Sequence, residues 1–134
     1  MKLSSFALAL ILTAALTTPL WAHHSFAAEY DSKQPVTLKG AVTKVEWMNP
    51  HVYFYIDVRD EATGKITNWA LEMGAPAVIQ RNGWTRNSMK IGDMVIVDGT
   101  RAKSGQPHAN ARSVTLASTG QKLGAGSSEG QPEQ

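Results

Sequence analysis

Apolar and polar residues alternate along much of the stretch 36–117, which predicts a protein built mainly of β-strands. The clearest strand is 51–59, with the sequence HVYFYIDVR. Its even-numbered residues, Val52 to Val58, are all apolar and are expected to face a core. The odd-numbered residues, among them Tyr53 and Tyr55, are expected on the outer face.

The same pattern predicts further strands and one helix. The first strand, 36–47, changes phase near 40–44, which requires a β-bulge or a sharp bend. Pro76 near the start and Gly83 just after the end predict a short helix over 75–83. The remaining predicted strands are 66–73, 94–102 and 109–117.

This order of elements, three strands, a short helix and two more strands, is typical of an OB-fold. The predicted fold class is therefore all-β with one short helix, an OB-fold-like five-stranded Greek-key barrel over residues 36–117. The helix and the change of phase in the first strand favour this barrel over a five-stranded sandwich or another small barrel.

The first 22 residues read as a secretory signal peptide. Lys2 precedes an apolar run that is too short to cross a bilayer, and Ala22 supplies the small residue at the cleavage position. Cleavage there makes His23 the mature N-terminus, whereas the alternative site lies after Ala27. We therefore expect export to the periplasm of a Gram-negative bacterium, with no membrane span after cleavage.

The segments on either side of the barrel lack a regular pattern. Residues 23–35 show no sustained period and end at Pro35, so they predict an irregular leader. Residues 118–134 are rich in Gly, Ser and Gln, with Leu123 as the one apolar anchor, and they predict a disordered tail.

Composition narrows the classes of function. The absence of cysteine excludes disulfides, thiolate metal ligands and a cysteine nucleophile. The 13 Lys and Arg residues, of which Lys2 lies in the signal peptide, nearly balance 11 Asp and Glu residues. Because nucleic-acid binding requires a concentrated positive charge, no nucleic-acid partner is expected.

Three histidines form the candidate metal site: His23, His24 and His51. After cleavage at Ala22, the α-amine and the imidazole of His23 can chelate one ion, and a second imidazole completes the nitrogen-rich set that Cu(II) prefers. His51 is the candidate third ligand because it begins a strand just after the turn at Asn49. Copper is the one cofactor considered, and the alternative is that the paired histidines are simply solvated in the leader.

The second candidate is an aromatic ligand-binding face. Tyr53 and Tyr55 share the outer side of the second strand, part of the surface by which OB-folds commonly bind oligomers. Trp47 and Trp69 complete the predicted set. Such a face suits stacked sugar rings or a peptide strand. The alternatives are that aromatic pairs or the leader cover the tyrosines, and that Trp47 packs in the core.

No catalytic constellation is recognised. The sequence contains no Gly-rich phosphate loop and no serine in a nucleophile elbow. The carboxylates Asp57, Asp60, Glu61 and Glu72 do not converge by spacing. We therefore expect no enzymatic activity, and metal-dependent redox chemistry at the N-terminal histidines is the one form considered.

Several motifs resemble those of a known family. They are HHSFAAEYD at 23–31, Gly40-x-Val42 leading to EWxNPH at 46–51, GWTR at 83–86 and ANARSV at 109–114. In these residues the chain resembles a family of small exported bacterial proteins catalogued as a domain of unknown function. The resemblance covers nearly all of 23–117 and implies export and a single domain, but it brings no activity, substrate or catalytic residue.

The sequence thus predicts a periplasmic, OB-like binding module for a small ligand or a periplasmic protein partner. The alternative is a copper-binding or copper-carrier protein that uses the mature N-terminal histidine and His51.

Overall fold

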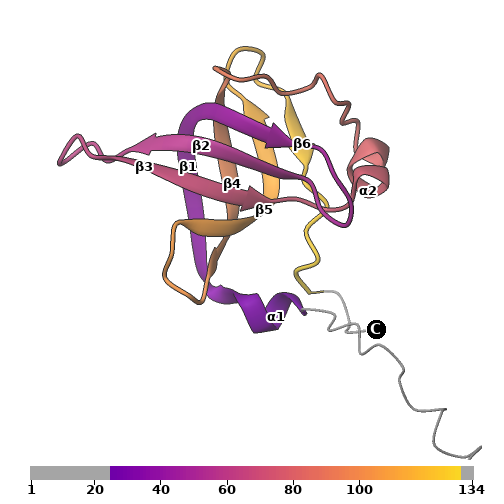
Figure 1. The fold of residues 1–134 in the computed structure, drawn as a ribbon, viewed down its shortest axis with the longest axis horizontal. Coiled ribbons are helices and arrows are strands. Elements are labelled where there is room, and N and C mark those ends of the chain that lie inside the picture. The colour runs from indigo at the N-terminus through magenta and orange to yellow at the C-terminus, as the bar shows by residue number, and fades with distance from the viewer. Residues whose placement is uncertain (1–24, 131–134) are drawn as a thin grey trace, which may run out of the picture.

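The structure is a computed structural model and describes residues 25–130. This part of the chain folds into six strands and two short helices (Figure 1). Neither helix is long and apolar enough to cross a membrane. The elements are α1 (Phe26–Glu29), β1 (Tyr30–Glu46), β2 (Tyr53–Arg59), β3 (Ile66–Glu72), α2 (Pro76–Arg81), β4 (Met94–Ala102), β5 (His108–Leu116) and β6 (Lys122–Gly124).

The strands pair in the order β3-β2-β1-β4-β5-β6, and each neighbouring pair is antiparallel. A further, parallel pairing of β3 with β5 sets Ala70 opposite His108 and Glu72 opposite Asn110. This pairing closes the sheet into a ring, which confirms the predicted OB-like barrel and its short helix α2. The described chain adds the short strand β6 to the five predicted strands.

Strand β1 is long enough to pair with both β4 and β2. Residues 35–41 run beside β4, and residues 40–46 run beside β2. The ladder with β2 shifts register between Val42 and Lys44, at the predicted change of phase. At Gly40, where the two ladders overlap, an added Cβ would lie 2.3 Å from the carbonyl oxygen of Asp57. Only glycine therefore fits at this crossing.

The barrel interior is filled by the apolar side of the strands, as the alternation predicted. Phe54 and Ile56 of β2 and Leu71 of β3 are fully buried. Helix α2 begins with Pro76 in its first turn, where the missing N–H costs nothing, and it packs Ile79 against the core. This continuous apolar core holds the ring of strands together.

The leader is more regular than the prediction of an irregular segment over 23–35. The hydroxyl of Ser25 accepts a hydrogen bond from the backbone N–H of Ala28 and begins α1. Tyr30 is buried, pairs with Ala102 of β4 and begins β1 six residues before the expected start at Val36. Because the residues that follow Tyr30 are polar and largely exposed, hydrophobic periodicity could not reveal the strand.

The predicted disordered tail also differs from the structure over residues 118–130. Strand β6 pairs with β5, and Ala125 beyond it is fully buried. The hydroxyl of Ser127 donates to Asn110 at 2.6 Å, and the carboxylate of Glu129 accepts from the hydroxyl of Thr100 at 3.0 Å. Backbone and polar contacts hold this segment together with two apolar residues, Leu123 and Ala125, which pack on the core. Two apolar residues form no periodic pattern, so the composition gave no sign of order. Residues 131–134 lie outside the described part.

We predict that Gly40→Ala lowers the free energy of unfolding by about 1–3 kcal/mol, because the backbone of β2 must move away from the new methyl group. Urea denaturation measures the change. The matched control is Lys39→Ala, at an exposed position on the same strand, with an expected change within about 0.5 kcal/mol. Equal unfolding midpoints for the two variants would contradict the close packing described.

Candidate functional site

One cluster of polar side chains gathers where α1, β3 and the start of β5 meet, and we call it the acid–histidine cluster. At its centre lies the carboxylate of Glu72, the last residue of β3, which is only 7% exposed. The members of the cluster are Glu29, Tyr30, His51, Tyr53, Glu72 and His108.

Two side chains donate hydrogen bonds to Glu72, and the ring of a third residue, His51, lies beside it. The hydroxyls of Tyr30 and Tyr53 both bond to Oε2, the second at 2.9 Å. The Nδ1 atom of His51 lies 3.2 Å from Oε1 and 3.0 Å from the carbonyl oxygen of Met73. Since both of these neighbours are acceptors, Nδ1 carries the proton of the neutral ring, and Nε2 is left with a lone pair. A buried carboxylate needs such donors to offset its loss of hydration.

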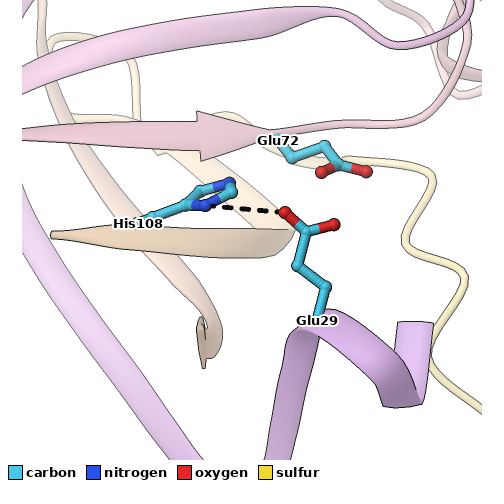
Figure 2. Close-up of side chains that lie close together, drawn as sticks. All are labelled: Glu29, Glu72 and His108. Atoms are coloured by element: carbon cyan, nitrogen blue, oxygen red, sulfur yellow. Dashed lines mark ion pairs between the residues drawn. The ribbon is translucent and has the colours of Figure 1, made fainter. Parts of the chain in front are cut away.

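The hydrogen-bond chain continues from Tyr30 to His108. The Nε2 atom of His108 lies 2.9 Å from the Tyr30 hydroxyl. On the other side of the ring, Nδ1 lies 3.7 Å from Oε1 of Glu29, and Figure 2 shows Glu29 reaching from α1 toward this atom. The imidazole of His108 is therefore held between a phenol and a carboxylate.

Barrel closure explains why these groups meet. The parallel pairing of β3 with β5 brings the start of β5, with His108, beside the end of β3, with Glu72. Helix α1 reaches the same place because the backbone N–H of Lys103 donates to the carbonyl of Glu29 at 2.8 Å, and because Tyr30 pairs with Ala102. Three segments far apart in the sequence thus supply one site.

The tyrosines of the cluster are fixed as neutral donors. Burial, followed by the hydrogen bond and the negative charge of Glu72, raises the pKa of Tyr30 far above its usual value. Burial and the charge of Glu72 likewise raise the pKa of Tyr53. Both phenols keep their protons at neutral pH, so neither is poised to act as a phenolate nucleophile.

Three residues of the cluster lie close enough together to be candidate metal ligands. Glu29, Glu72 and His108 each offer one ligand atom, and these atoms all lie within 4.8 Å of one another. Figure 2 shows the two carboxylates and the imidazole facing a common space. Chemically, this set of one nitrogen and two oxygens can accept a cation or a ligand that donates hydrogen bonds.

Of the three predicted metal-binding histidines, the structure places one in this cluster. His51 lies against Glu72, and its side chain is 41% exposed. His23 and His24 lie outside the described residues, so the proposed sharing of one ion between His23 and His51 stays a prediction.

The four aromatic residues predicted to form one ligand-binding face lie in different surroundings. Tyr53 belongs to the acid–histidine cluster, whereas the Tyr55 hydroxyl donates to Glu46 at 3.0 Å on the outer face of the sheet. Trp69 is buried beneath the guanidinium of Arg101, which lies 5.3 Å from its ring centroid.

Trp47 lies elsewhere again, partly buried against the core. The guanidinium of Arg86 lies over its ring at 5.8 Å from the centroid, at a small apolar pocket. The pocket is also lined by Val45, Val52, Met73, Trp84, Thr85 and Met89. The two motifs that contain Trp47 and Trp84 are far apart in the sequence, but both line this pocket.

Four members of the cluster were not predicted as site residues: Glu29, Tyr30, Glu72 and His108. Glu72 was considered as a carboxylate, but its spacing from the other acids suggested no convergence. His108 lies just before the predicted strand 109–117. Glu29 and Tyr30 both fall within the motif at 23–31, which was the one signal in the sequence that pointed to them.

The fold and this cluster define a small OB-like β-barrel protein with an acidic, histidine-containing site at the seam where the barrel closes. The chain belongs to a family of unknown function, described as "Family of unknown function (DUF6152)", whose model matches residues 11–111. This match confirms the resemblance seen in the sequence. No curated protein matches the chain.

Among solved structures, the fold is similar to that of Rim1, a mitochondrial single-stranded DNA-binding protein from S. cerevisiae. The TM-score is 0.50 at 10% sequence identity, and the match covers 63% of this chain and 93% of that chain. At this level of identity the likeness shows the fold alone.

We predict that Tyr30→Phe lowers the free energy of unfolding at neutral pH by about 1–3 kcal/mol, because Glu72 and His108 both lose a buried partner. The pKa of Tyr30 is higher in the folded than in the unfolded chain, so its contribution is complete below pH about 10 and declines as the pH rises above that value. The difference between wild type and variant should shrink accordingly in urea denaturation at alkaline pH.

Tyr55→Phe is the control for this comparison, because its hydroxyl bonds to Glu46 on the outer face of the sheet. The expected loss is below about 1 kcal/mol. If Tyr55→Phe proved as costly as Tyr30→Phe, the special position assigned to Tyr30 would be wrong.

Proposed function

We propose that the protein is an exported, OB-like binding module whose small ligand binds at the acid–histidine cluster. The observation that carries this proposal is the buried carboxylate of Glu72, already fixed by the hydroxyls of Tyr30 and Tyr53 at a place where Glu29 and His51 are still partly exposed. A site of this kind is rigid before its ligand arrives, so little ordering opposes binding.

The cluster is favoured over the outer aromatic face that the sequence suggested. Tyr55 is already occupied by Glu46 and by the ammonium of Lys44, which lies 5.2 Å from its ring centroid. Trp69 is buried and is not available for stacking. The aromatic residues therefore have partners within the barrel, whereas the carboxylate and imidazole groups of the cluster converge.

Binding without catalysis agrees with the state of the phenols in this site. Tyr30 and Tyr53 are held as neutral donors to Glu72, which suits orientation of a ligand rather than attack on it. Export rests on the signal peptide expected in residues 1–22, and the periplasm is the compartment that follows from it.

A nucleic-acid ligand is not part of this proposal, although the OB-like neighbour Rim1 is a single-stranded DNA-binding protein. The chain carries 13 Lys and Arg against 11 Asp and Glu residues. In addition, the converging groups include two carboxylates, Glu29 and Glu72, which repel phosphate groups.

The test is a titration of the ¹⁵N-labelled chain from residue 23 onward, followed by its amide NMR spectrum. The probes are zinc ions, spermidine, an oligosaccharide of glucose and a single-stranded oligodeoxynucleotide. We expect that each probe that binds shifts the amides of Glu29, Glu72 and His108, and that the oligodeoxynucleotide shifts none.

Two variants locate the effect. Glu29→Gln should weaken every shift at the cluster, whereas Glu46→Gln, which removes a carboxylate on the outer face, should leave the shifts unchanged. Shifts centred on Tyr55 and Lys44, or a spectrum that responds to no probe, would contradict the proposed site.

A further inference from the structure

We infer that the small ligand of the acid–histidine cluster is a divalent transition-metal ion, bound by His108, Glu72 and Glu29. This inference rests on the proposed function and names the ligand of that site. It differs from the copper site predicted from the sequence, because none of its three ligands is His23, His24 or His51.

The hydrogen-bond chain determines which nitrogen of His108 is free. The Tyr30 hydroxyl donates its one proton to Glu72, so its oxygen can only accept from His108 Nε2. The proton of the neutral imidazole is therefore on Nε2, and Nδ1 carries a lone pair. That lone pair faces the carboxylate oxygen of Glu29 at 3.7 Å. A cation between these two acceptors would replace their mutual repulsion by attraction.

The distance between Nδ1 of His108 and the carboxylate of Glu29 indicates a metal ion rather than a shared proton at this position. A nitrogen-to-oxygen distance of 3.7 Å exceeds the range of about 2.7–3.2 Å for a hydrogen bond between Nδ1 and the carboxylate. Two ligands of a tetrahedral zinc ion, each about 2.0–2.1 Å from the metal, lie roughly 3.3 Å apart. A shift of about half an ångström therefore converts this pair into metal ligands.

The electric charge of the site agrees with a divalent ion. Glu29 and Glu72 carry two negative charges, and Glu72 is largely removed from water. A divalent ion between them would balance both charges, which offsets the cost of burying Glu72. The hydroxyls of Tyr30 and Tyr53 would remain as an outer shell that orients the Glu72 carboxylate.

The donor atoms define the class of metal. One imidazole and two carboxylates, with no sulfur, suit Zn²⁺ and Cu²⁺ rather than Cu⁺, and the usual order of affinities favours Cu²⁺ over Zn²⁺. Three protein ligands leave a fourth position for water or an exchangeable group, which is the pattern of an open rather than a purely structural site.

The test is isothermal titration calorimetry of the chain from residue 23 onward with Zn²⁺, and competition with Cu²⁺. We expect one ion per chain at the cluster, and a loss of affinity of about tenfold or more in His108→Ala and in Glu29→Gln. Glu29 lies on the surface helix α1, so its variant keeps the proposal testable if His108→Ala fails to fold.

Matched variants distinguish this site from others. Asp98→Asn removes a carboxylate paired with Lys122 on another face, and the double variant His23→Ala with His24→Ala removes the terminal histidines. Both should bind zinc as the wild type does. Binding that survives His108→Ala and Glu29→Gln, or that is lost in the double variant, would overturn the inference.

The calorimetry and the NMR titration together distinguish two outcomes: that the ligand is not a metal ion, and that the cluster is not a binding site. If zinc and copper do not bind while spermidine or the oligosaccharide still shifts the amides of Glu72 and His108, the proposed metal ligand is wrong, but the cluster is still a binding site.

Discussion

The buried carboxylate of Glu72 is the constraint around which this end of the barrel is organised. A carboxylate with so little exposure is costly unless donors surround it. Those donors are the hydroxyls of Tyr30 from β1 and Tyr53 from β2, and the ring of His51 lies beside the same carboxylate. Tyr30 links this carboxylate to the rest of the site, because its hydroxyl also contacts Nε2 of His108.

The same strand pairing closes the barrel and assembles the site. The parallel contact between β3 and β5 is short, yet it completes the ring of strands and sets His108 beside Glu72. Helix α1 then adds Glu29 from the chain before β1, held by its backbone bond to Lys103. A change that opens this seam should therefore affect stability and binding together, whereas a change on the outer face around Tyr55 should affect neither strongly.

The fold could be predicted from the sequence further than the site could. The strict alternation in 51–59 correctly predicted which residues of β2 are buried. The change of phase near Gly40 correctly predicted the register shift between β1 and β2. The site depends on contacts between distant segments, Glu29, Glu72 and His108, and no local pattern encodes them. The ordered leader and tail were missed for a related reason, because capping, backbone pairing and polar contacts hold them rather than an apolar stripe.

The state of the His108 ring tests the account most directly. Long-range ¹H–¹⁵N NMR of the histidine side chains at neutral pH reports which ring nitrogen carries the proton. The account predicts a neutral His108 with its proton on Nε2, and a change at Nδ1 when Zn²⁺ is added. A ring protonated at both nitrogens, with a spectrum that does not respond to zinc, would contradict it.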